Sequence, residues 1–160
     1  MYKHILVAVG LKADLTTLRS AIEIALECGA RITALHVVNP APHLSRPAKG
    51  DFAATLEAYQ VEGRMVAERS SRALDEAHCQ GEAQIRMLPF SDITIGQVIG
   101  GAARELGADL VIVGSSDPGW FRLYLENVPK DVVRHCSMPV LVTTPQCPPK
   151  ARYTADALAV

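Results

Sequence analysis

The sequence predicts an α/β protein in which helices cover both faces of a parallel sheet. Short apolar runs rich in β-branched residues alternate with longer segments whose apolar residues recur at helical spacing. The run at 109–114, DLVIVG, is apolar at every interior position, which indicates a strand buried on both faces. Strands and helices that alternate in this way form a doubly wound sheet through right-handed crossovers. We therefore expect an open five-stranded sheet.

The first part of the chain supplies a strand, a helix and a second strand. Apolar runs at 4–9 and 32–38 predict the two strands. Gly29 stands where a helix C-cap belongs, and either Asp14 or Thr16 can cap the helix start. The helix residues expected to face the sheet are Leu18, Ile22, Ala25 and Leu26.

The middle of the chain supplies a long connection and one long helix. Three prolines and a glycine within 40–51 forbid regular structure there. A helix is expected over 52–79, with Gly81 marking its end. Gly63 weakens this helix by about 1 kcal/mol relative to alanine, which predicts a bend or fraying. The inward stripe is expected to be Leu56, Tyr59, Met65, Val66, Ala73 and Leu74.

The last part of the chain repeats the alternation. Its strands are expected at 83–88, 109–114 and 139–143, and its helices at 95–106 and 128–136. In such a sheet, ligands sit beyond the carboxyl ends of the strands, where the strand order reverses.

Composition indicates one domain without a membrane span or a polyanion-binding surface. Of the 160 residues 49% are hydrophobic and 21% charged, and the net charge is -1, which excludes membrane and nucleic acid as expected partners. The N-terminal apolar run is too short for a secretory signal, so we expect a cytoplasmic protein. The four cysteines are widely spaced with no CxxC, so we expect no metal site.

Four phrases of the sequence resemble the universal stress protein family in order, spacing and wording. They are HILVAVG, LHVVNP, AARELGADLVIVGS and VVRHCSMPVLVT. The resemblance implies a universal stress protein domain over 1–144 and leaves 145–160 as a C-terminal tail. It further implies a Rossmann-like fold of the adenine nucleotide alpha hydrolase-like kind, with strand order 3-2-1-4-5, and a homodimer with roles in stress tolerance and signalling.

Many members of that family bind ATP through a loop of the form G-x2-G-x9-G-[ST] and an Asp at the end of the first strand. Gly114 matches the first glycine, but Asp117 stands at the second. The closing pair falls on 127–128, or on 126–127 if the following helix is held in register. Gly10 replaces the Asp that reads adenine. Three elements are thus altered, as in the UspA-like branch, whose members are generally regarded as not binding ATP.

The altered loop predicts a vestigial nucleotide pocket. If Glu126 begins the last helix, its carboxylate complements the positive helix end that a phosphate would use. A carboxylate about 5 Å from a phosphate costs on the order of 3 kcal/mol at an effective dielectric of about 20, or about a hundredfold in affinity. The pocket residues are expected to be Gly10, Val38, Gly114, Ser115, Ser116, Arg122, Glu126 and Asn127.

Several loop residues keep two interpretations. Ser115 and Ser116 either contact phosphate or hydrogen-bond the turn, and Arg122 either holds an anion or is a solvated cation. Trp120 and Phe121 either stack a base or partner, or close the end of the sheet as core. Asn127 is interpreted as the cap of the following helix, a role that needs no ligand.

The sequence contains no nucleophile elbow, HExxH, P-loop lysine or paired carboxylates at a telling spacing, so no enzyme is expected. His36 is interpreted as a satisfied core group, and no nearby carboxylate pattern indicates a catalytic His135. The leading hypothesis is a stress-response regulator without a cofactor, acting as a homodimer through the last strand and through unidentified protein partners. The alternative is an ATP- or AMP-binding signalling switch with a divergent loop, and a weaker third option is a hydrolase or phosphotransferase using Ser115 and Ser116.

Overall fold

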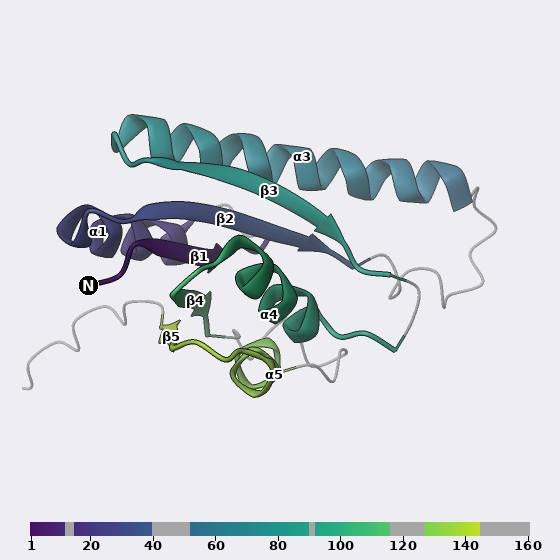
Figure 1. Ribbon diagram of the computed structural model, residues 1–160. Coiled ribbons are helices and arrows are strands. Elements are labelled where there is room, and N and C mark those ends of the chain that lie inside the picture. Colours follow the sequence, from purple (N-terminus) through teal and green to yellow (C-terminus); the bar gives the residue numbers. More distant parts are fainter. Residues whose placement is uncertain (12–14, 40–51, 90–91, 116–126, 145–160) are drawn as a thin grey trace, which may run out of the picture.

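The fold is a single five-stranded parallel sheet with helices on both faces (Figure 1). The structure is a computed structural model that describes residues 1–11, 15–39, 52–89, 92–115 and 127–144. The strand order β3-β2-β1-β4-β5 confirms the predicted fold class and order. The strands are β1 (His4–Ala8), β2 (Arg31–Val38), β3 (Gly81–Met87), β4 (Leu110–Gly114) and β5 (Val140–Thr143), and the helices are α1 (Thr16–Cys28), α3 (Phe52–Glu76), α4 (Ile95–Leu106) and α5 (Val128–His135).

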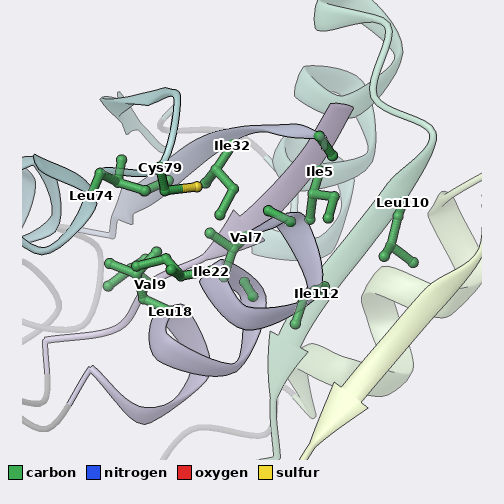
Figure 2. Packing of buried hydrophobic residues seen from close by; sticks show 14 of the residues in the cluster. Ile5, Val7, Val9, Leu18, Ile22, Ile32, Leu74, Cys79, Leu110 and Ile112 are labelled. Carbon is green, nitrogen blue, oxygen red and sulfur yellow. The ribbon is translucent and has the colours of Figure 1, made fainter. Parts of the chain in front are cut away.

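Two hydrophobic cores lie on opposite faces of the sheet. Successive side chains of a strand point to opposite faces, so Ile5 and Val7 of β1 join the core beneath α1 and α3, whereas Leu6 joins the core beneath α4 and α5. Figure 2 shows the first core, which contains Ile5 and Val7 of β1, Ile112 of β4, and Leu18 and Ile22 of α1. Burial of each such side chain stabilises the fold by roughly 1.5–3 kcal/mol.

The predicted inward faces of α1 and α3 are correct at most positions and wrong at one in each helix. Leu26 is 53% exposed, and Ala21 takes an inward place in α1 instead. Met65 of α3 is 55% exposed, whereas its neighbour Val66 is buried, as predicted, together with Leu74. Both errors arise because the pattern includes an apolar residue beside the true stripe.

Two glycines have roles different from those predicted. The helix α3 continues unbroken through Gly63, where a Cβ would lie 3.0 Å from the Cγ2 of Val38, so glycine lets the helix approach the sheet closely. Gly81 does not end the helix, which stops at Glu76. It is the first residue of β3, where a Cβ would lie 2.6 Å from the Ile32 carbonyl oxygen.

The C-termini of α1 and α4 follow the predictions, whereas the start of α1 departs from them. Gly29 and Gly107 occupy the left-handed region with φ of 65° and 66°, which confirms the predicted helix ends. Leu15 occupies the N-cap position of α1 with φ of 44° and no side-chain hydrogen bond, so Thr16 does not cap the helix. Asp14 lies outside the described residues.

Candidate functional site at the carboxyl edge of the sheet

The ends of β1 and β2 form one side of the candidate crevice. Gly10 is exposed, and a Cβ built there would meet no atom of the described residues within 4 Å. Val38 is only 4% exposed, because Gly63 of α3 packs against it, and its carbonyl accepts a hydrogen bond from the Leu88 amide at 2.8 Å. This side therefore offers open space at Gly10 and little side-chain surface at Val38.

A buried histidine holds the backbone just before Gly10. The Nδ1 of His36 lies 2.7 Å from the Val9 carbonyl oxygen, so Nδ1 donates the hydrogen bond. Burial lowers the pKa of His36, and the nearby Arg69 lowers it further, although the Val9 carbonyl and Glu62 oppose this shift. The neutral imidazole is thus a satisfied core group, as its place in a strand predicted.

The end of β4 is filled by contacts with α1 and β5. A Cβ on Gly114 would lie 2.7 Å from the Oγ1 of Thr17, so any larger residue here would displace the Thr17 hydroxyl in the first turn of α1. The backbone amide of Ser115 donates to the Thr143 carbonyl at 2.6 Å. The amide that follows Gly114 is therefore used for pairing with β5, and packing alone accounts for the glycine.

Two threonines that the sequence analysis did not single out close this end of the crevice. The Thr143 hydroxyl lies 3.2 Å from the Thr17 hydroxyl oxygen and 3.4 Å from the Val113 carbonyl oxygen. The hydrogen bond between the two hydroxyls joins β5 to α1. Nothing local marks either residue, because each is an ordinary threonine at the end of its element.

The start of α5 is capped from within the chain. The Asn127 side-chain oxygen accepts from the Lys130 amide at 3.2 Å, which confirms the predicted helix cap. Pro129, in the first turn, has no amide hydrogen to offer. Asp131 adds a negative charge to the same turn. Asn127 and Asp131 together offset the positive helix end that would attract a phosphate.

The carboxylate of Asp131 also joins α5 to α4. Its Oδ2 accepts from the Thr94 hydroxyl at 2.5 Å and from the Gly96 amide at 3.0 Å, at the start of α4. His135 donates from Nδ1 to the Asp131 carbonyl oxygen at 2.9 Å, and the same nitrogen lies 3.2 Å from Oδ1. A carboxylate therefore does lie beside His135, contrary to expectation, but its Oδ2 is occupied in capping α4.

Only part of the predicted pocket can be placed. Gly10, Val38, Gly114 and Ser115 lie at the ends of neighbouring strands, and Asn127 begins α5. The remaining predicted pocket residues and the two loop aromatics lie outside the described residues, and their roles stay predictions. These are Ser116, Arg122, Glu126, Trp120 and Phe121.

The described residues contain neither a cluster of metal ligands nor a membrane-spanning helix. Across the five described ranges, no three His, Cys, Asp or Glu side chains gather as ligands of a metal would. No helix in the same part of the chain has the length and apolarity that a membrane crossing requires.

A model of the Universal stress protein family matches residues 1–144. The chain belongs to this family. Universal stress protein MJ0531 of Methanocaldococcus jannaschii is 26% identical over 144 residues, which cover 89% of this chain and 82% of that protein.

Solved structures of other universal stress proteins share the fold. A family member from Burkholderia pseudomallei is 24% identical, with a TM-score of 0.69, over 89% of this chain and 96% of that one. The universal stress protein of Archaeoglobus fulgidus in complex with dAMP is 20% identical, with a TM-score of 0.61, over 88% of this chain and 97% of that one. At these identities, the likeness establishes the fold alone.

Proposed function

We propose that this universal stress protein is a non-catalytic regulator whose nucleotide crevice is closed at its phosphate end, which is formed by the end of β4 and the start of α5. The observation that carries the proposal is the start of α5, where the ATP-binding pattern has Gly-[ST]. Here Asn127 occupies the Lys130 amide and Pro129 has no amide hydrogen. The binding of an anion at the start of a helix depends on backbone amides that are free to donate hydrogen bonds to it. A phosphate would have to displace the Asn127 cap and would meet the charge of Asp131.

The end of β4 supports the same proposal. The Ser115 amide pairs with Thr143, and Thr17 fills the space above Gly114. A phosphate-binding loop needs backbone that a ligand can approach closely, and at this strand end the approach is taken by α1 and β5. No catalytic step is assigned to these residues.

Calorimetric titration of the full chain with ATP and Mg²⁺ tests the closed crevice. We expect no saturable heat at low micromolar nucleotide, and the same result with dAMP, the ligand of the Archaeoglobus fulgidus relative. Saturable binding of either nucleotide at low micromolar concentration would overturn the proposal.

We further propose that the protein acts as a homodimer through β5. This strand ends the sheet and pairs with β4 alone among the described strands. Leu141 and Val142 are each 40% exposed, and Val133 of α5 is 54% exposed. An edge strand with apolar side chains is a template for pairing with a second copy about a two-fold axis.

Light scattering on the full chain tests the dimer. We expect a mass twice the 17.2 kDa of one chain, and Leu141→Lys should shift the mass toward one chain because it places a charge at the edge. Ile85→Lys, at the opposite edge strand β3 with a 38% exposed side chain, is the matched control and should leave the dimer intact. A monomeric wild type, or dissociation only in the β3 variant, would contradict this interface.

The alternative is a nucleotide-binding switch that acts in stress signalling. The open space at Gly10 and the dAMP complex of the Archaeoglobus fulgidus relative favour it. Nucleotide that copurifies with the protein, seen as absorbance at about 260 nm, would favour this alternative. The cytoplasmic location and contacts with further protein partners, expected from the sequence, belong to both proposals.

A further inference from the structure

The outer side of the α1 and α3 layer carries a groove between these two helices, which cover the same face of the sheet (Figure 1). Its volume is about 470 Å³, within the range of small-molecule sites. Its apolar lining includes Leu15, Ile22, Ala73 and Ala77, which belong to or pack against the core beneath. The groove therefore offers an apolar floor to a ligand.

The charged residues of the groove are three arginines and two glutamates. Arg19 and Arg72 each have a glutamate one turn later on the same helix, Glu23 and Glu76, which also line the groove. One turn before and one turn after Arg69 on α3 lie Met65 and Ala73, which carry no charge. Three arginines and two glutamates give the groove a net charge of +1, and Arg69 is the arginine that has no glutamate at this spacing.

The guanidinium of Arg69 is only partly satisfied by the described residues. Its Nη2 donates to the Leu11 carbonyl at 3.3 Å, a long hydrogen bond, and its Nε is buried without any hydrogen-bond partner. No carboxylate among the described residues lies within 4.0 Å of it. Native proteins leave few buried donors unsatisfied, so a guanidinium that has one long hydrogen bond and no carboxylate partner among the described residues has room for an anion at its accessible nitrogens.

We propose that the groove between α1 and α3 binds a small apolar monocarboxylate, with its carboxylate on Arg69 and its body on Leu15, Ile22 and Ala73. The planar guanidinium matches a carboxylate in a bidentate pair. A single negative charge neutralises the groove, whereas Glu23 and Glu76 repel a phosphate dianion. The Arg69 end of the groove adjoins the crevice at the strand ends, because the Leu11 carbonyl that Arg69 contacts follows Gly10. The rest of the groove runs between α1 and α3, so carboxylate binding there does not depend on whether the crevice takes a nucleotide.

Hexanoate is the probe, followed by amide chemical shifts of the full chain labelled with ¹⁵N. We expect saturable shifts confined to α1 and α3. The matched neutral ligand 1-hexanol and inorganic phosphate should each bind at least tenfold more weakly. Equal binding of hexanol, equal binding of phosphate, or shifts spread over other elements would overturn the proposal, and these comparisons need no variant.

Substitution of Arg69 completes the test. Arg69→Met should weaken hexanoate binding at least tenfold and Arg69→Lys by less, since lysine keeps the charge but loses the bidentate geometry. Arg134→Met, at an exposed position on α5, is the control and should bind hexanoate as the wild type does. Unchanged affinity in Arg69→Met, with its fold verified by thermal melting, would overturn the proposal.

Discussion

A Cβ added at Gly10, after β1, would meet no atom of the part of the chain that the structure describes within 4 Å, whereas one added at Gly114, at the end of β4, would lie 2.7 Å from the Thr17 hydroxyl oxygen. The two ends of the crevice thus differ in kind. At the end of β1, Gly10 lacks the carboxylate side chain that the ATP-binding pattern has there, and the described residues leave room for one. At the phosphate end, it is built into the packing of α1, β5 and α5. Restoring one residue can reverse the first departure but not the second.

The largest effect is expected at Gly114. Gly114→Ala should lower the free energy of unfolding by about 1–3 kcal/mol, because the new methyl group overlaps the Thr17 hydroxyl. Gly10→Ala, the matched control, should change it by no more than about 0.5 kcal/mol. Urea unfolding measures both. Combining Gly114→Ala with Thr17→Ala, which removes the hydroxyl, should recover part of the loss, and equal costs at the two glycines would break the comparison.

The next effect concerns the carboxylate that joins α5 to α4. Asp131→Ala should cost about 1–2 kcal/mol, because the Thr94 hydroxyl and the Gly96 amide lose their shared acceptor. Asp75→Ala, at an exposed position near the end of α3, is the control and should be close to neutral. If thermal unfolding ranks the two variants equally, the phosphate end is not held by this contact.

A smaller effect is expected at the cap of α5. Asn127→Ala should cost about 1 kcal/mol, and Asn127→Gly only a few tenths of that amount, because glycine is itself a tolerated N-cap. Chemical denaturation of both variants measures the difference. An alanine variant as stable as the wild type would show that the side chain does not occupy the Lys130 amide in solution.

The smallest effect is a pH dependence of stability that arises from His36, beside the end of β1. The pKa of His36 is lowered, chiefly by burial, so the unfolded chain takes up a proton near pH 6.5 while the folded protein still holds a neutral ring. The free energy of unfolding should therefore fall as the pH drops below about 6.5, and it should level off once the pH is below the pKa of His36 in the folded protein. His36→Asn keeps a donor near the Val9 carbonyl and should reduce this slope. His4, whose pKa is lowered chiefly by burial and then by Arg31, should account for part of what remains.

The sequence was sufficient for the fold and for the local parts of the site. Continuous apolar strands fix a doubly covered sheet, and Asn127 followed by a proline is recognisable as a helix start without knowledge of the rest of the chain. The contacts that fill the phosphate end join residues far apart, 37 positions for Thr94 and Asp131 and 126 for Thr17 and Thr143. Such pairs depend on how helices pack on the sheet, and no local pattern encodes them.

The most direct test of the filled phosphate end is calorimetry on the Gly10→Asp variant with ATP and Mg²⁺. This variant restores the acidic residue of the ATP-binding pattern at a position with room for it, while Thr17, Thr143 and Asn127 remain in place. We predict that it folds as the wild type does and still shows no saturable binding at low micromolar ATP. Binding in that range would contradict the account, because one side chain at the end of β1 would then have been enough.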